Sequence, residues 1–370
     1  MALPLILILI IIYFYSLLIV LFYLEIEENT SISDEVPEHL GPLSIIIPFR
    51  NEADQLPGLL EDLANQSYPD ELYEVILVDD HSMDASWSVV ESFVKENKAF
   101  NSLQLPMKLS GKKAALSHGI SQAKHDWIIQ VDADCRVGPR YIASHMLFLE
   151  AHPSDLVAGL VSASTGGGGF LNTFERLDLL SLMGSSAGSF ALGRPMMCSG
   201  ANLAYSRELY LETRSFDPGN IIASGDDMFL MIGARKLGKK LSFNTCRESL
   251  VETCPAKGLR TLIVQRIRWG SKSVQYRMPD IQLLAVLVSL CNISILLLPL
   301  WLILYTELWP WMAGAWLVKT LADFMLLFRM TGITDSRADL KMFAPVSLLY
   351  HPFFVVSMLG SLVGKPVWQR

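Results

Sequence analysis

Charged residues are scarce in this chain of 370 residues. Asp, Glu, Lys and Arg together make up 18% of it, whereas 51% of the residues are hydrophobic. A soluble domain usually carries about 25% charged residues. The net charge of −7 shows no excess of basic residues, so nucleic acid is not expected as a partner. This composition excludes a disordered or collagen-like chain and predicts a protein that is partly embedded in a membrane.

Cysteine is also scarce. The chain has five cysteines and no Cys-x-x-Cys pair, and histidines do not gather near them, so a zinc site is not expected. An odd, dispersed set excludes a small disulfide-rich fold and is typical of a domain that faces a reducing cytosol. These residues are Cys135, Cys198, Cys246, Cys254 and Cys291.

The hydrophobic residues are concentrated at the two ends of the chain. Residues 3–24 carry no charge and are long enough to cross a bilayer core of about 30 Å. They lack the basic N-terminal region and the Ala-x-Ala cleavage site of a signal peptide, so we expect residues 1–24 to be a retained transmembrane anchor. Residues 25–42 are acidic and polar and are expected to form a linker.

Three more apolar segments lie in the C-terminal part, at about 283–304, 311–328 and 343–363. Basic residues precede the first segment and separate the last two, so the positive-inside rule predicts a hairpin of two spanning helices with both outer ends in the cytoplasm. These basic residues are Lys257, Arg260, Arg266, Arg268, Lys272 and Arg277, and then Arg329, Arg337 and Lys341.

The last apolar segment leaves its topology open. Pro345 and Pro352 could break it or make it re-entrant, and a full crossing would put Lys365 and Arg370 outside. Lys319 and Asp323 lie four residues apart inside the preceding segment and can pair on one helix face. Such a pair is either functional or a packing contact, and packing is favoured here.

Residues 43–277 are predicted to alternate between strands and helices. This alternation indicates a parallel sheet with crossover helices, and ligands of such sheets bind beyond the carboxyl ends of the strands. Strands are expected at 43–48, 74–78 and 126–131, and helices at 53–65, 87–96 and 112–123.

Polar residues follow each of these three strands, as Pro48-Phe-Arg-Asn-Glu52, Asp79-Asp80 and Asp132-Ala-Asp134. Two carboxylates two positions apart on extended chain point to one side and suit Mg²⁺ or Mn²⁺, which take further ligands from phosphates. The pair Asp79-Asp80 could instead form a turn or a helix cap. We expect the three strand ends to meet at one crevice.

The second half of this region carries further candidates. Residues 170–190 are predicted to form a helix that lies either in the membrane interface or in a buried core. Gly200, within Cys198–Asn202, would let the backbone approach a ligand closely. Ser224-Gly-Asp-Asp227 opens a helix that runs to about Lys236, and its acids could be caps or functional groups.

Gln265, Arg268 and Trp269 share one face of a predicted helix within residues 258–277. A guanidinium group suits a pyrophosphate, and an aromatic ring offers a platform for a sugar. The alternative is an arginine and a tryptophan that sit at the membrane surface just before a spanning helix.

Six motifs occur in one order across residues 43–277. Through these motifs and their order, the chain resembles the family-2 inverting glycosyltransferases. It looks most similar to their membrane-anchored branch, which includes ceramide glucosyltransferase, cellulose synthase and hyaluronan synthase. The resemblance implies an α/β glycosyltransferase-A fold, a Rossmann-like mixed sheet, with N- and C-terminal transmembrane helices. The motifs are Ile45-Ile-Ile-Pro48 with Arg50-Asn51-Glu52, Val78-Asp79-Asp80-His-Ser82, Gly111-Lys112-Lys113-Ala-Ala-Leu116, Val131-Asp-Ala-Asp-Cys135, Ser224-Gly-Asp-Asp227 and Gln265-x-x-Arg268-Trp269.

The resemblance also implies the residues that bind the donor. Lys112 would lie near the base or the phosphates, Asp132 would face the ribose, and Asp134, with Asp132, would bind the Mg²⁺ or Mn²⁺ that bridges the diphosphate. The residues expected at the base and ribose are Glu52, Asp79 and Asp80, with Pro48 and Arg50 beside them.

For the reaction itself, the resemblance makes Asp227 the general base, with Asp226 beside it. The usual Glu-Asp pair is Asp226-Asp227 here, so which of the two is the base stays open. Arg268 would stabilise the leaving diphosphate, and Trp269 would form the floor of the acceptor site, while Gln265 of the same motif is a further candidate binding residue.

The sequence thus predicts a membrane-bound, metal-dependent inverting glycosyltransferase. Its donor would be a nucleoside-diphosphate sugar, with UDP expected from the family, and its acceptor a lipid or lipid-linked hydroxyl. The catalytic domain is expected at the cytoplasmic side of a bacterial inner membrane. The alternatives are a processive polysaccharide synthase, a nucleotidyltransferase and a membrane scaffold that senses a nucleotide.

Overall fold

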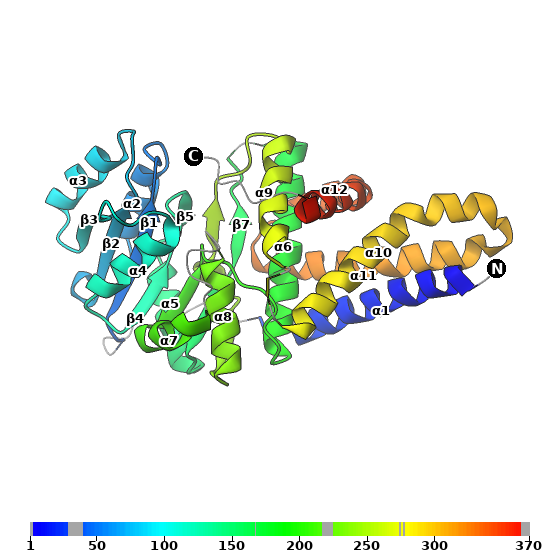
Figure 1. Cartoon of the computed structure of the whole chain (residues 1–370), viewed down its shortest axis with the longest axis horizontal. Helices are drawn as coiled ribbons and strands as arrows, with labels where there is room; N and C mark the ends of the chain where they lie inside the picture. Colours follow the sequence, from blue (N-terminus) through cyan, green and yellow to red (C-terminus); the bar gives the residue numbers. More distant parts are fainter. Residues whose placement is uncertain are drawn as a thin grey trace. The chain divides into compact units, whose positions relative to one another are not determined.

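The computed structural model of the protein describes residues 3–28, 40–166, 168–216, 225–273, 275–276 and 278–363 (Figure 1). Most of the expected linker, together with Ser224, Arg277, Lys365 and Arg370, lies outside the described residues. The chain divides into two compact units, which we describe separately. The helical unit comprises Met1–Ile26, Thr165–Leu192 and Pro255–Arg370, and the α/β unit comprises Glu27–Ser164 and Gly193–Cys254.

A seven-stranded mixed sheet forms the centre of the α/β unit, in the order β3-β2-β1-β4-β8-β6-β9. The pairs within β3-β2-β1-β4 are parallel, β8 is antiparallel to β4 and to β6, and β6 is parallel to β9. The strands are β1 Leu43–Phe49, β2 Tyr73–Asp79, β3 Phe100–Gln104, β4 Trp127–Gln130, β6 Leu156–Gly159, β8 Leu203–Ser206 and β9 Leu241–Asn244.

A second, three-stranded sheet has the order β5-β10-β7, with β10 antiparallel to β5 and parallel to β7. Its strands are β5 Cys135–Val137, β7 Val161–Ala163 and β10 Val251–Thr253. The helices of the α/β unit are α2 Leu56–Ala64, α3 Ser86–Glu96, α4 Lys112–Gln122, α5 Tyr141–Ala151, α7 Arg207–Thr213 and α8 Asp226–Lys236, with short 3-10 turns at Asp70–Leu72, Arg214–Phe216 and Arg247–Ser249.

The core of the main sheet explains why its strands are so apolar. Every residue of β1 and β2 is buried, as expected for parallel strands that are covered on both faces. Helix α4 packs tightly on these strands at Gly119, where an added Cβ would lie 2.6 Å from Ile46 and 3.0 Å from Val78. This packing confirms the predicted α/β fold and brings the N-terminus of α4 to the carboxyl ends of the strands.

Strand β3 is an element of the main sheet that the sequence pattern does not predict. Its residues, Phe-Asn-Ser-Leu-Gln, are mostly polar, and only Phe100 is buried. It lies at the edge of the sheet beside β2, where solvent reaches one side of the strand. A polar edge strand gives no continuous apolar run for a sequence reading to detect.

The helical unit contains four helices that are long and apolar enough to cross a membrane. They are α1 Leu3–Glu25, α10 Pro279–Leu304, α11 Trp309–Ile333 and α12 Phe343–Val363. Three further elements complete the described part of this unit, namely α6 Phe170–Ala191, α9 Leu259–Ser273 and the 3-10 helix η6 Arg337–Met342, and η5 Thr306–Leu308 joins α10 to α11. Helix α12 runs through Pro352 as one continuous helix, so the break that the prolines suggested does not form.

Polar contacts join α1 to α11. Lys319 is 1% exposed and pairs with Asp323 at 2.5 Å, as the spacing predicted. The hydroxyl of Tyr15 on α1 donates to Asp323 at 3.1 Å. The guanidinium of Arg329 donates to the carbonyl of Tyr23 at 2.6 Å. Tyr15 comes before Tyr23 on α1, and their partners Asp323 and Arg329 follow in the same order on α11. Helices α1 and α11 therefore run in the same direction.

Helix α6 is buried along most of its length. An added Cβ on Gly188 would lie 2.5 Å from Phe22 of α1, and one on Gly184 would lie 2.8 Å from Met330 of α11. Its carboxylate Asp178 pairs with Arg266 of α9 at 2.6 Å. The structure therefore favours the buried of the two alternatives for residues 170–190, and their position relative to a bilayer stays a prediction.

Candidate active site

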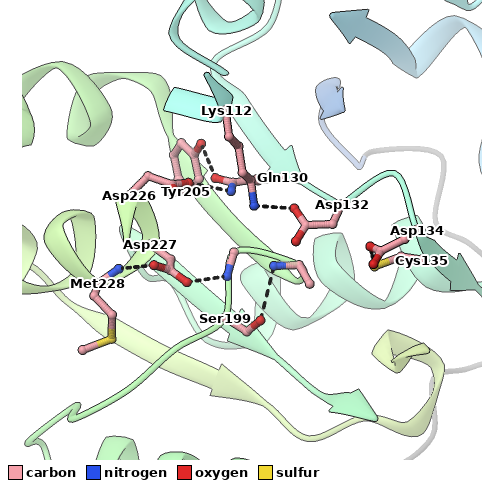
Figure 2. A network of polar contacts seen from close by, with 12 residues as sticks. Lys112, Gln130, Asp132, Asp134, Cys135, Ser199, Tyr205, Asp226, Asp227 and Met228 are labelled. Carbon is pink, nitrogen blue, oxygen red and sulfur yellow. Dashed lines mark hydrogen bonds and ion pairs between the residues drawn. The ribbon is translucent and has the colours of Figure 1, made fainter. Parts of the chain in front are cut away.

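Asp227 is held by backbone groups at the start of α8. Gly225 has a left-handed φ of 92° directly before the helix, a conformation that suits glycine. One carboxylate oxygen of Asp227 accepts the N–H of Gly200 at 2.9 Å, and the other accepts the N–H of Met228 at 2.8 Å (Figure 2). Backbone N–H groups at a helix N-terminus favour a negative charge. These two N–H groups therefore fix the orientation of the side chain.

The neighbouring acid, Asp226, is held by a side chain of the sheet. Gln130, the last residue of β4, donates its amide to Asp226 at 2.9 Å and accepts the hydroxyl of Tyr205 at 3.3 Å (Figure 2). An added Cβ on Gly200 would lie 2.8 Å from the amide nitrogen of Gln130. Gln130 and Gly200 thus pack against each other, and each holds one acid of the pair.

Lys112 stands at the N-terminus of α4 and pairs with Asp132 at 2.5 Å. Burial disfavours the charged amine, but the carboxylates of Asp132 and Asp226 outweigh it and raise the pKa of Lys112. The ammonium group therefore stays charged and connects the acid after β4 with the pair on α8. Figure 2 shows these side chains converging from three elements.

A second group of acids surrounds Asp134. Burial and the neighbouring Asp132 raise the pKa of Asp134, although Lys112 opposes this shift. Burial raises the pKa of Glu52 to about 7, with further contributions from Asp134, Asp132 and Asp84. Within the described part of the chain, no basic side chain forms an ion pair with Asp134. A region where carboxylates repel one another is one that a cation would stabilise.

The donor set at this point fits a divalent cation. Asp132 and Asp134 offer two hard oxygen ligands, and no cluster of three or more acids, histidines or cysteines with metal-binding geometry occurs among the described residues. Mg²⁺ is usually bound by one or two carboxylates and takes its remaining ligands from phosphates and water. The residues present therefore suit a metal that is held jointly by the protein and a diphosphate.

Hydrogen bonds and an ion pair connect the segments that follow β1 and β2. Both oxygens of Asp80 accept the N–H of Gly111 at 3.0 Å, and Arg50 lies 3.7 Å from the same carboxylate. Asp79 accepts the N–H of Ser82 at 3.0 Å, which is the turn that the sequence offered as the alternative. Pro48 is buried within β1. Asp80 thereby docks the loop that precedes Lys112, so this acid has a structural role whatever it binds.

The helical unit holds the remaining candidates on α9. Trp269 is 37% exposed, and Gln265 and Arg268 are half-buried. The residue between them, Arg266, is buried, stacks 4.2 Å from the Trp269 ring and donates to Gln265 at 2.8 Å. The tryptophan is thus supported from within its own helix. The convergence of Arg268 and Trp269 with Asp227 joins the two units and stays a prediction.

Sequence reasoning missed Gln130 and Asn202. Asn202 accepts the hydroxyl of Tyr141 at 3.1 Å and the ring N–H of His145 at 2.9 Å, and it donates to the carbonyls of Leu160 and Ser249. This network fixes the segment that carries Gly200. The sequence signal that could have identified Gln130 and Asn202 was a polar residue at the end of an apolar strand. The close backbone approach predicted at Gly200 does occur, but its partner is Asp227 of the same chain.

Comparison with known proteins agrees with this geometry. Residues 44–213 match the sequence model described as glycosyl transferase family 2. The poly(ribitol-phosphate) beta-glucosyltransferase of Bacillus spizizenii is 28% identical over 204 residues, which cover 54% of this chain and 30% of that protein. The undecaprenyl-phosphate 4-deoxy-4-formamido-L-arabinose transferase of Pseudomonas fluorescens is 36% identical over 128 residues, 34% of this chain and 36% of that protein. The chain spans about a third of the length of these two relatives.

One solved structure resembles the whole chain. It is the mannosyltransferase PcManGT from Pyrobaculum calidifontis, in complex with GDP-Man and Mn²⁺, with a TM-score of 0.58. Its sequence is 16% identical, and the match covers 97% of this chain and 99% of that one, so the likeness concerns the fold. With the acids at the strand ends and the mixed sheet that carries them, these matches show that the chain has a glycosyltransferase-A-like fold and that its residues 44–213 are similar to glycosyl transferase family 2.

Proposed function

We propose that this protein is a membrane-bound inverting glycosyltransferase. It transfers a sugar from a nucleoside-diphosphate sugar, with UDP expected as the nucleotide, to a hydroxyl of a lipid or lipid-linked acceptor. The observation that carries this proposal is the orientation of Asp227 by two backbone N–H groups, in the same unit as Asp132 and Asp134. A base and a pair of acids that can hold the divalent cation of a diphosphate are two parts that a single displacement needs.

The donor is positioned by the acids around β4. Asp134 and Asp132 would hold Mg²⁺ or Mn²⁺, and such an ion neutralises negative charge on a departing diphosphate. Lys112 places a positive charge beside the same acids. Arg268 of α9 stabilises the leaving diphosphate through its planar guanidinium group. Glu52, Asp79 and Asp80 line the part of the sheet edge that is assigned to the base and ribose.

Asp227 acts as the general base. It takes the proton from the acceptor hydroxyl as that oxygen forms a bond to the anomeric carbon, while the bond from this carbon to the diphosphate oxygen breaks. Attack from the face opposite the leaving group inverts the configuration. Burial and the charge of Asp226 raise the pKa of Asp227, which makes its carboxylate a stronger base near neutral pH.

A lipid acceptor agrees with the rest of the chain. Four helices are apolar enough to enter a membrane, and the exposed Trp269 is a residue that favours the boundary between lipid and water. One relative is named for transfer that involves undecaprenyl-phosphate, a lipid-linked phosphate. The basic residues before α10 and after α11 favour a cytoplasmic catalytic unit.

The test is a screen of radiolabelled UDP- and GDP-sugars with membranes that contain the protein, followed by lipid extraction and mass measurement. The proposal predicts a lipid-soluble product with one added sugar and release of a nucleoside diphosphate. The Asp227→Asn variant is the control and should give no labelled lipid. A long polymer would indicate a processive synthase, and release of pyrophosphate would indicate a nucleotidyltransferase. Absence of both transfer and donor hydrolysis would favour a nucleotide-sensing scaffold.

A further inference from the structure

Two contacts show where the ends of α12 lie within the helical unit. At its start, the ring of Phe343 lies 5.1 Å from that of Phe324 on α11. Near its end, an added Cβ on Gly360 would lie 2.5 Å from Ile267 of α9. A helix that crosses a bilayer has its two ends at opposite faces, so these contacts identify where α12 begins and ends.

The neighbouring helices define that face. Helices α1 and α11 run in parallel, and the contact of Arg329 with Tyr23 places their C-terminal ends at one level. The short turn η5 connects α10 to α11, so the start of α10 at Pro279 lies at this level too. Helix α9 ends at Ser273, only a few residues before α10 begins. The partner of Gly360 therefore belongs to the face from which α10 enters the membrane.

A crossing α12 would make different contacts. About 20 helical residues span the bilayer core, so the end of a crossing α12 would lie beside η5 at the far face. The structure instead places Ser361 beside Gly270 of α9, where an added Cβ would lie 3.0 Å from the serine Cβ. The middle of α12 contacts α6 through Phe353 and Phe174, with ring centroids 4.9 Å apart. In Figure 1, α12 lies beside α6 and α9, while α1, α10 and α11 extend away from them together.

We propose that α12 does not cross the bilayer. It lies within the leaflet at the face where α1 and α11 end.

The exposed apolar face of α12 contacts the acyl chains of the lipid bilayer. Five apolar side chains on this helix are between 51% and 66% exposed, and Val363 is 88% exposed. Helices α10 and α11 also expose leucine and valine side chains. Helix α9, which carries Gln265, Arg268 and Trp269, is packed on α12 and would be held at the membrane surface by it. The five are Leu348, Leu349, Val356, Leu359 and Leu362.

Depth measurements test the orientation of α12 without any assay of enzyme activity. Leu348→Cys and Leu359→Cys, each labelled with bimane in the full chain, place probes on one helix face about 16 Å apart along its axis. Vesicles then carry spin-labelled lipids that quench either near the headgroup or near the bilayer centre. We expect the two variants to give the same ratio of shallow to deep quenching, and the chain without these substitutions corrects for label on native cysteines.

The proposal would be overturned if one probe were quenched mainly by the headgroup label and the other mainly by the label near the bilayer centre. It would also be overturned if either probe were not quenched at all. A reporter after Arg370 gives the second test. A fluorescent protein that folds only in the cytoplasm should be active there, and a phosphatase that folds only outside should be inactive. An active phosphatase would show that α12 crosses. Neither outcome depends on whether the protein transfers sugar, so the proposed function and this topology fail independently.

Discussion

The backbone N–H of Gly200 donates to the carboxylate of Asp227 at 2.9 Å. The glycine precedes β8 and the acid opens α8, so two segments that are far apart in the sequence meet at this hydrogen bond. Gln130 packs against the same glycine and binds Asp226. The two acids are therefore oriented separately, one by backbone and one by a side chain, which gives them different environments.

Gly200→Ala tests this orientation. The added methyl group would lie 2.8 Å from the amide of Gln130, which must therefore move, and 3.4 Å from the Cβ of Asp227, which is an ordinary contact. A displacement of about 1 Å in a catalytic group can cost about 100-fold in rate. We expect kcat to fall by about this factor while the KM for the nucleotide sugar stays nearly constant. Gly138→Ala is the matched control, because its added Cβ meets open space. An unchanged kcat in Gly200→Ala would contradict the role of this hydrogen bond.

Removing the carboxylates after β4 tests the metal site. Asp134→Asn should raise the Mn²⁺ concentration needed for half-maximal transfer by at least about tenfold, since even indirect partners of a metal ligand contribute that much. Calorimetric titration of Mn²⁺ in the presence of nucleoside diphosphate measures the same loss without turnover. Asp126→Asn changes an exposed carboxylate of the same unit and serves as the control. Equal Mn²⁺ affinity in both variants would argue against Asp134 as a ligand.

The stability of the α/β unit should depend on pH through His145. Burial lowers the pKa of this histidine to about 4 from 6.5, although its bond to Asn202 opposes the shift. Between these values the unfolded chain binds the proton and the folded chain does not, so stability falls as pH drops from about 6.5 to about 4. A shift of this size corresponds to about 3 kcal/mol.

His145→Gln provides the comparison, because its amide can still donate to Asn202. Thermal unfolding of the variant should lose less stability than the parent chain over the same pH interval. The comparison cancels the contribution of other titrating groups, since these are common to both chains. Identical pH dependence in the two proteins would mean that His145 does not titrate as its burial implies.

Variants of the Lys319–Asp323 pair distinguish a packing role from a functional one. Lys319→Met removes the cation beside the half-buried carboxylate of Asp323, which still accepts the Tyr15 hydroxyl, and breaking such a pair costs up to about 3 kcal/mol. The double variant Lys319→Met with Asp323→Leu should recover most of the thermal stability and retain activity. A double variant that is stable but inactive would show that the pair has a function beyond packing.

The repeating strand and helix pattern was predictable because buried parallel strands leave continuous apolar runs, such as Ile45-Ile-Ile, and polar residues mark their ends. The pairing of Lys319 with Asp323 was predictable because it is local on one helix. Strand β3 was not, because an edge strand needs no apolar face. The spacing of residues along the chain thus carries most of the local structure.

Contacts between distant segments could not be predicted in the same way. Gln130, Gly200 and Asn202 act through partners that lie between 27 and 96 residues away in the chain. Their residue types are common in loops and strands, so no local pattern distinguishes them. The role of Arg266 was likewise hidden, because its partner Asp178 belongs to another helix.

The central claim is that Asp227 is the base of the transfer, and paired asparagine variants test it most directly. Side-by-side measurement of kcat and donor binding for Asp227→Asn and Asp226→Asn keeps the size of each side chain and removes one charge. General base catalysis contributes about 100- to 10,000-fold, so Asp227→Asn should lose at least that much in kcat and still bind the nucleotide sugar, with a smaller loss for Asp226→Asn. Turnover of Asp227→Asn at the parent rate, or an inactive Asp226→Asn beside an active Asp227→Asn, would contradict the account.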